Sequence, residues 1–375
     1  MLSLNPLPAL SAATQPRGAV KLNDTLIEGW VSWEVESNNF YAADTFRITF
    51  LKNMLPAERN ANWFSELQTA FVEIFAGFPA NPDDYRASEL TSMLYGRVDE
   101  VEFDIVRGRI DLIGRDLTSE FIDAKTTEKW PNKTASQIAT DLAMRRGLTP
   151  QVTATSTLVG TYYDIDHVTM TDQRSEWDIL NYLAHLEQFA VYVRGKTLYF
   201  GPKPDPKATP YVLMWQEPNA DQAFPDGNFV DLRFTRGLTV SRGIQVVVRS
   251  FNSKGKKSYA ATYPSKGNTT QAGKAKPFGG TQIYTYTIPG LTQEQALQRA
   301  QTIYADLIAH EMKLSAVLPG DNILGIDTMV QVMGTGTAWD QIYYPDSVTR
   351  RMSFDEGYVM NLHAKNHAPD SVVAP

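Results

Sequence analysis

Apolar and polar residues alternate along much of the first hundred-odd positions, which is the pattern of strands with one buried face. In the run TFRITFL (45–51), three large apolar side chains share one face, and threonine and arginine occupy the other. Residues 96–116 contain two more alternating runs that turn near Gly108. We therefore expect an antiparallel β-barrel or sandwich domain in residues 1–118.

The period then changes from that of a strand to that of a helix. In TASQIATDLAMRRG, Ile138 and Leu142 are four residues apart, and Thr134 and Gln137 have the spacing of a capping box. Gly147 follows the last periodic residue, where glycine commonly ends a helix. The stretch predicts a helix.

A second helix is predicted in SEWDILNYLAHLEQ, with Ser175 as N-cap and Asp178 in the first turn. It leads into FAVYVRGKTLYF, where Gly195 and Lys196 mark the turn of a β-hairpin. Two helices and a hairpin make a small α/β domain, which we assign to residues 119–205.

Prolines at alternate positions in GPKPDPKATP (201–210) forbid helix and central strand, so this stretch is expected to be a linker. Strands return at 229–237 and 243–251, and more fill 315–365. Between them a long helix is predicted at 292–314, with its apolar stripe at Leu297, Ala300, Tyr304 and Leu307. The fold class is α+β, mainly β, with a third domain at 206–375.

Composition narrows the possible functions. The chain has 42 acidic side chains against 35 Lys and Arg, a formal charge of -7, which argues against a dedicated nucleic-acid binder. It has no cysteine, so disulfides and thiolate chemistry are excluded. The N-terminal segment lacks the pattern of a signal peptide, and no stretch approaches about 18 consecutive apolar residues. We expect a protein made in the cytoplasm, without a membrane-spanning segment.

Four stretches in a fixed order carry a resemblance to a known family: LIGRD (112–116), the block at 175–202, the run LPGDNILGIDTMVQVMGTG (318–336) and the terminal hairpin at 343–364. With them the chain resembles the hub proteins of contractile injection systems. These include the Mu-like baseplate hub and the late control protein D family, with the N-terminal part of the type VI secretion spike protein VgrG as a distant relative.

The resemblance implies two related antiparallel β-barrel domains with the small α/β domain between them. It also implies a non-enzymatic structural protein of the virion tail baseplate, a homotrimer around an axial channel for DNA. Its partners would be the hexameric tail tube above, the trimeric central spike below and other baseplate proteins. Two similar barrels in each of three subunits would present six platforms to the tube. If DNA passes, the channel lining should be acidic or neutral, because lysines there would hold phosphates.

A weak internal repeat agrees with such a duplication. In the hairpin at 98–112, Phe103-Asp104 precedes a turn containing Gly108. In the hairpin at 348–362, Phe354-Asp355 precedes a turn containing Gly357. Any hairpin with a glycine turn would look similar, so this sign alone leaves the question open.

Candidate metal and phosphate sites have simpler explanations. The first candidate is a divalent metal site made of oxygen and imidazole groups that lie close together along the chain: Asp164, Asp166, His167 and Asp172. Their alternation favours the polar face of a strand instead. His363 and His367 have a helical zinc-ligand spacing where a strand is expected. The loop at 267–275 has the wrong glycine spacing and lacks the hydroxyl residue of a phosphate-binding loop. GxSxG and Rossmann motifs are missing. We expect no enzyme activity, no cofactor and no metal.

The segment 253–276 is basic and rich in Gly, Ser and Thr, with no acidic residue. One reading is a solvated hairpin tip whose lysines deter edge aggregation. The other is a contact to an acidic neighbouring tail protein or to DNA phosphates. The candidate partner-binding residues are Lys254, Lys256, Lys257, Lys266, Lys274 and Lys276.

Two further functions stay open on the sequence. Tail hubs can carry or adjoin peptidoglycan-degrading enzymes. The 7 Trp and 17 Tyr would suit receptor or carbohydrate binding, although aromatic residues in such numbers are more often core and interface anchors.

Overall fold

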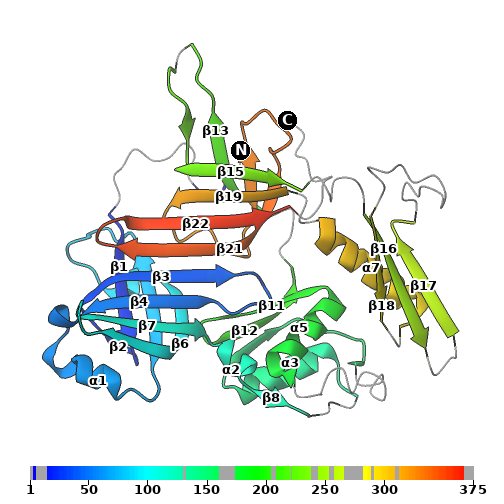
Figure 1. The fold of residues 1–375 in the computed structure, drawn as a ribbon, viewed down its shortest axis with the longest axis horizontal. Coiled ribbons are helices and arrows are strands. Elements are labelled where there is room, and N and C mark those ends of the chain that lie inside the picture. Colours follow the sequence, from blue (N-terminus) through cyan, green and yellow to red (C-terminus); the bar gives the residue numbers. More distant parts are fainter. Residues whose placement is uncertain are drawn as a thin grey trace.

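A computed structural model describes residues 3–5, 15–128, 130, 132–159, 174–203, 208–220, 222–237, 244–252, 257–265, 282–288, 291–308 and 312–366 (Figure 1). Strands dominate, which confirms the mainly β class. None of the helices in these ranges is long and apolar enough to cross a membrane.

The first part of the chain forms the predicted strands. Alternate side chains of β4 are buried, with Phe46, Ile48 and Phe50 at most 3% exposed. Gly108 adopts a positive φ of 62° in the turn between β6 and β7, as a tight hairpin requires. The elements are β1 (Arg17–Leu22), β2 (Thr25–Leu26), β3 (Trp30–Asn38), β4 (Thr45–Leu51), α1 (Ala61–Ser65), β5 (Phe71–Gly77), β6 (Thr91–Asp104) and β7 (Arg109–Asp116), with 3-10 turns at Lys52–Met54, Ala57–Arg59 and Ala87–Glu89.

The middle part contains the two predicted helices and the hairpin. Both capping boxes are present, Thr134 with Gln137 and Ser175 with Asp178. The helices pack on a three-stranded sheet of order β11-β12-β9 around their own apolar core. The elements are α2 (Ser119–Ile122), β8 (Lys125–Thr126), α3 (Ala135–Arg145), β9 (Thr149–Val152), β10 (Arg174–Ser175), α5 (Glu176–Glu187), β11 (Phe189–Arg194) and β12 (Thr197–Pro202).

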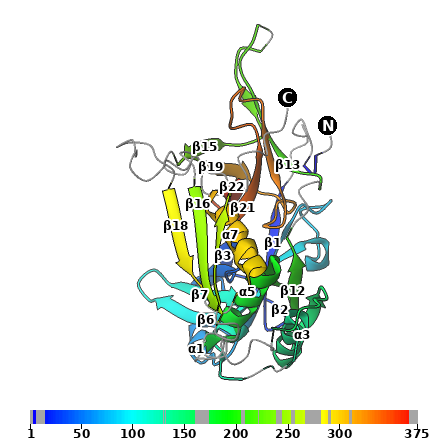
Figure 2. The same ribbon diagram turned by 90° about the vertical axis from the view of Figure 1, so that its right-hand side faces the viewer.

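The last part returns to strands and adds one helix. Its elements are β13 (Tyr211–Gln216), β14 (Asp226–Gly227), β15 (Asp231–Arg236), β16 (Ile244–Asn252), β17 (Lys257–Tyr263), β18 (Gln282–Thr287), α7 (Gln293–Ile308), β19 (Met312–Pro319), β20 (Val330–Met333), β21 (Ile342–Ser353) and β22 (Gly357–Lys365). The β13–β14 hairpin projects from the body of the molecule (Figure 2).

Two details of the long helix differ from the sequence prediction. The helix ends at Ile308 rather than at residue 314, because Met312 already begins β19. Of the predicted stripe, Ala300 is buried and Tyr304 and Leu307 pack against the same core, so these three positions are confirmed. Leu297 is 40% exposed, and Ala296 is buried in its place.

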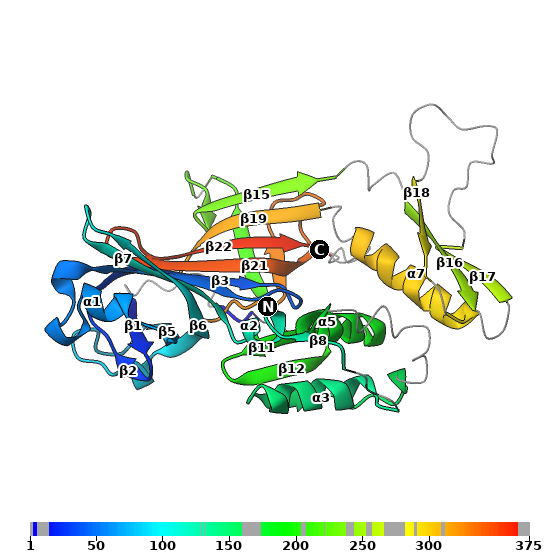
Figure 3. The same cartoon turned by 60° about the horizontal axis from the view of Figure 1, so that its bottom comes forward.

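The segment 253–276 is also more ordered than a hairpin tip in its described part. Strand β17 lies within the segment and pairs antiparallel with β16, which precedes the segment. Strand β16 also pairs parallel with β18, which follows the segment. Helix α7 packs on these three strands, and Val246, Val248 and Ala300 contribute to a separate apolar core. This small α/β unit stands beside the helices of the middle part (Figure 3).

The first and last parts of the chain share one sheet. Strand β21 pairs antiparallel with β3, over Ser347↔Asn38 to Ser353↔Ser32, and so joins residues about three hundred positions apart. Met352 and Tyr358 from the last part are buried in the core of the first. The two β-rich parts are thus continuous across this junction, and their division into two barrel domains stays a prediction.

Strand order is the same in the two β-rich parts. In the first it runs β1-β5-β6-β7-β4-β3, and in the last β13-β20-β21-β22-β19-β15. Taken in chain order, the six strands of one part correspond one for one to the six of the other. The two parts differ in two ways. Strand β1 is antiparallel to β5, whereas the corresponding β13 is parallel to β20. The last part also has the unit from β16 to α7 inserted between β15 and β19.

Candidate functional site

Strands of the first and last parts form a continuous eight-stranded path of order β15-β19-β22-β21-β3-β4-β7-β6 (Figure 1). One face packs on the two β-part cores. The strand registers place the alternate side chains together on the opposite face. We call this opposite face the polar face.

Charges of both signs are nearly equal in number on the polar face, but they are segregated. The first part contributes the acidic residues Glu34, Glu36, Glu100, Glu102, Asp104 and Asp111, with Arg47, Arg97, Arg109 and Arg115. The last part contributes Arg233, Lys313, Arg351 and Lys365 with the acid Asp231. The face is close to neutral overall, acidic on one half and basic on the other.

A dense ion-pair cluster fixes the acidic half. Arg47 lies 2.9 Å from Asp111 and 3.0 Å from Glu102, and Arg109 lies 2.8 Å from Asp111. Thr49 donates a hydrogen bond of 2.6 Å to the same Asp111 carboxylate. Burial alone would raise the pKa of Asp111, but the hydrogen bonds from Arg109, Arg47 and Thr49 hold it below its ordinary value. These side chains are charged and held in place.

The junction between β21 and β3 is tied on both faces of the sheet. On the polar face, Arg351 contacts Glu34 at 2.5 Å. On the other face, the buried Arg350 donates to the carbonyl oxygens of Asp321, at 2.9 Å, and Leu324. The ring of Tyr358 lies 5.9 Å from that of Trp33. This contact is a packed interface rather than a loose edge.

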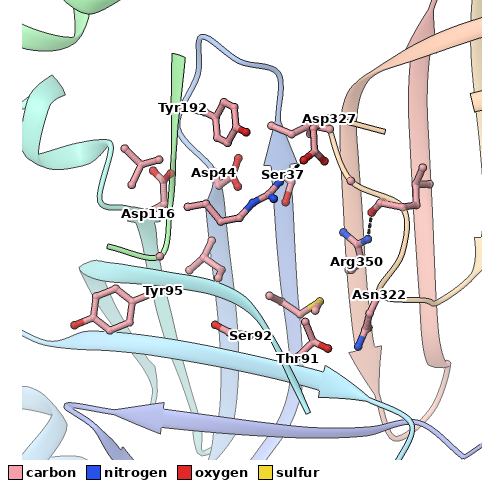
Figure 4. Close-up of a pocket in the computed structure, with 18 of the residues that line it drawn as sticks. Ser37, Asp44, Thr91, Ser92, Tyr95, Asp116, Tyr192, Asn322, Asp327 and Arg350 are labelled. Atoms are coloured by element: carbon pink, nitrogen blue, oxygen red, sulfur yellow. Dashed lines mark hydrogen bonds and ion pairs between the residues drawn. The ribbon is translucent and has the colours of Figure 1, made fainter. Parts of the chain in front are cut away.

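A cavity of about 230 Å³ lies where the three parts of the chain meet (Figure 4). Its lining includes Asp44, Asp116, Tyr192, Asp327 and Arg350, one or two residues from each part. It was not foreseen from the sequence, because its carboxylates lie far apart along the chain.

Two carboxylates in this cavity accept hydrogen bonds from groups close to them along the chain. Asp44 accepts a 2.7 Å hydrogen bond from the N–H of Asn38, and Asp116 accepts from the N–H and hydroxyl of Thr118. Burial raises the pKa of Asp44 to about 7. Burial and the neighbouring Asp44 raise the pKa of Asp116 well above its ordinary value. Their hydrogen bonds explain the pair as a structural element that closes two turns.

Most of the candidate site residues fall outside the described part of the chain. This holds for Lys254, Lys256, Lys266, Lys274 and Lys276, for the metal candidates Asp164, Asp166, His167 and Asp172, for His367 and for the loop at 267–275. Lys257 begins β17, but its side chain is likewise outside the described residues. The proposed lysine contact therefore stays a prediction.

His363 does lie in the described part, and it is exposed on β22, so the predicted strand is confirmed there. Across the described ranges, no group of three or more His, Asp and Glu side chains is arranged to hold a metal ion.

The comparisons with known proteins agree on the fold. No family model and no curated protein matches the sequence. The structure is similar to the tail protein from Neisseria meningitidis MC58, with a TM-score of 0.64 and 13% identity over 95% of this chain and 99% of that one. It is also similar to the 43 kDa tail protein of prophage MuSo2 from Shewanella oneidensis, with a TM-score of 0.59 and 13% identity over 97% and 99% of the chains.

A third similar structure is the Escherichia coli c3393 protein. It is described as a component of the type VI secretion system with structural similarity to the T4 bacteriophage tail proteins gp27 and gp5. Its TM-score is 0.53, with 10% identity over 95% of this chain and 79% of that one. The resemblance read from the sequence is thus confirmed at the level of the fold: the chain shares its fold with phage tail proteins and with a component of a type VI secretion system.

Proposed function

We propose that this chain is a structural, non-enzymatic hub of a contractile phage tail baseplate. Three copies form a ring around an axial channel, which joins a hexameric tail tube above to a trimeric central spike below and contacts other baseplate proteins. Its place is then the baseplate of the virion. The proposed division is a first barrel at 1–118, an α/β domain at 119–205 and a second barrel at 206–375. The fold of known tail proteins supports this role.

The observation that carries the proposal is the matching strand order of the two β-rich parts. Two like parts in each of three copies give six similar surfaces in a ring. A six-fold tube can dock on such a ring with each of its subunits meeting a like surface. A single-part hub with three-fold symmetry would leave half of the tube subunits without an equivalent contact.

The polar face of the eight-stranded path suits the channel lining. It carries acidic and basic side chains in nearly equal number, so its net charge is close to zero. A lining rich in unpaired lysines would bind the DNA backbone and slow its passage. The arginines of the acidic half, such as Arg47 and Arg109, are held by carboxylates.

The basic segment 253–276 is proposed to lie away from this face and to contact a partner. It belongs to the unit of β16, β17, β18 and α7, which is inserted beside the eight-stranded path (Figure 3). Six lysines without an acidic residue favour an acidic tail protein or DNA phosphates as the ligand.

Native mass spectrometry of the purified chain tests the ring directly, and the proposal expects a trimer. A stable monomer or a two-fold dimer at high protein concentration would contradict it. Zymography on peptidoglycan tests the alternative of a tail hydrolase, and clearing would count against a purely structural role. Binding on a glycan array would favour the third reading, a receptor-binding protein.

A further inference from the structure

The loop between β3 and β4 holds the middle part of the chain against the first part. The hydroxyl of Tyr41 donates a 2.9 Å hydrogen bond to the carbonyl oxygen of Phe189, and the Tyr41 ring stacks on that of His185 at 4.3 Å. The carbonyl oxygen of Tyr41 accepts a 3.1 Å hydrogen bond from the indole N–H of Trp177. Residues 39–44 therefore contact both α5 and β11, and we call them the grip loop.

Asp44 closes the grip loop. Its carboxylate accepts a 2.7 Å hydrogen bond from the N–H of Asn38, and the Asn38 side chain donates to the carbonyl oxygen of Ala43 at 2.8 Å. These two bonds join the two ends of the loop. Because Tyr41 lies between those ends, its position against the middle part depends on Asp44.

Asp116 holds the other connection between the same two parts. It is 4% exposed, and its carboxylate accepts hydrogen bonds from the N–H and the hydroxyl of Thr118, at 3.1 and 2.9 Å, where the chain leaves β7 for α2. The N–H of Asp116 donates to the carbonyl oxygen of Asp44 at 2.9 Å. The grip loop and the covalent entry to the middle part thus meet at one pair of carboxyl groups.

Both carboxyl groups line the cavity of about 230 Å³ where the three parts meet (Figure 4). The two arginines of this cavity are already engaged, because Arg194 contacts Asp327 at 3.2 Å and Arg350 donates to two carbonyl oxygens. They attract Asp44 only through space. The charged and titratable groups that share the lining with the pair are Tyr95, Tyr192, Arg194, Asp327 and Arg350.

We propose that Asp44 and Asp116 form a proton-controlled latch between the first and middle parts of the chain. With both carboxyls protonated the pair is uncharged, and the grip loop stays closed on α5 and β11. Loss of a proton places a charge inside the cavity, which is relieved when the grip loop loosens and water reaches the pair. The latch lies within one chain and does not depend on the ring proposed above.

The direction of the response follows from the proton affinity of the closed latch. Burial raises the pKa of Asp44 to about 7, and burial together with Asp44 raises the pKa of Asp116 well above its ordinary value. In the loosened latch, contact with water returns both carboxyls towards ordinary behaviour. The closed state therefore holds protons that the loosened state releases. It is firmest below about pH 4 and loosens as the pH rises towards 7.

Hydrogen exchange of the full-length chain, measured by mass spectrometry at pH 5 and pH 7, tests the latch. Labelling times are matched for the pH dependence of intrinsic exchange, so that only a structural change appears. One proton released on opening raises the loosened population by up to about tenfold per pH unit. Peptides from the grip loop and from 176–190 should therefore exchange about tenfold faster or more at pH 7. Peptides from 347–363, which contain neither carboxyl, should change little.

Three variants assign the effect to its residues. Asp44→Asn keeps the acceptor for the Asn38 N–H but has no proton to lose, so its grip loop should exchange at pH 7 as the parent's does at pH 5. Asp116→Asn removes the second carboxyl and should also reduce the pH response. His185→Asn is the matched control, since a histidine can change charge in the same range. Its difference between the two pH values should equal that of the parent.

Equal protection of the grip loop at pH 5 and pH 7 in the parent protein would overturn the proposal, whatever the variants do. A full pH response in both Asp44→Asn and Asp116→Asn would overturn it as well. A response that disappears in His185→Asn and persists in Asp44→Asn would assign the switch to the histidine and refute the carboxyl latch.

Discussion

The buried carboxylates at the meeting point of the three parts make the stability of the protein depend on pH. Burial raises the pKa of Asp44 from an ordinary 3.8 to about 7, although Arg194 and Arg350 lower it. The folded chain then holds a proton on this carboxyl that the unfolded chain has lost. The contribution of Asp44 to stability is fully present below about pH 4 and is lost as the pH rises towards 7.

Asp44→Asn removes this titration and keeps the acceptor for the Asn38 N–H, which donates to Oδ1 at 2.7 Å. A shift of about three pH units corresponds to about 4 kcal/mol, as an upper value for the cost of the charged form. The variant should therefore match the parent near pH 4 and exceed its free energy of unfolding by up to that amount at pH 8. Loss of the Asp44 charge also relieves the neighbouring Asp116.

Thermal melts of both proteins from pH 4 to pH 8 measure this difference, which should reach several degrees at pH 8. Asp84→Asn changes an exposed carboxyl to the same amide and serves as the control. If Asp44→Asn and the parent differ by the same amount at every pH, the carboxyl does not carry a proton in the folded state, and the reasoning is refuted.

The remaining predictions concern folding and partners. In the parent protein, Arg146 donates hydrogen bonds of 2.7 and 2.8 Å to the buried carboxylate of Glu176. Glu176→Ala removes this partner and should lower the free energy of unfolding, measured in urea, by about 2–4 kcal/mol. Gly114→Ala should lower the folded yield, since its Cβ would lie 2.1 Å from the carbonyl oxygen of Arg97; Gly147→Asn, in open space at positive φ, should not. Charge reversal of the six lysines in segment 253–276 should impair virion assembly or DNA delivery; the changed residues are Lys254, Lys256, Lys257, Lys266, Lys274 and Lys276, each to Glu. Normal assembly and delivery by that variant would refute the proposed lysine contact.

Local chemistry explains which elements the sequence could predict. The helices α3 and α5 are marked by capping boxes at Thr134 and Ser175, and the hairpin turns by Gly108 and Gly195 at positive φ. Such signals depend on a few neighbouring residues. The end of α7 lacks one, because the helical apolar period continues past Ile308 without a glycine or proline before β19. Strand β17 was missed since its alternation is short and lies among Lys, Gly and Ser.

Long-range contacts explain what the sequence could not predict. The pairing of β21 with β3 joins Thr349 to Glu36 across most of the chain, and nothing in either strand specifies its partner. Asp44 and Asp116 look like ordinary surface carboxylates until three separate parts of the chain enclose them.

An image of the purified particle, with this chain located in it, tests the central claim most directly. The account predicts three copies in one closed ring between tube and spike, with the polar face of the eight-stranded path turned towards the axis. It predicts six similar surfaces towards the tube, two from each copy. A different copy number, a position on a fibre or outer baseplate arm, or a polar face turned outward would contradict it.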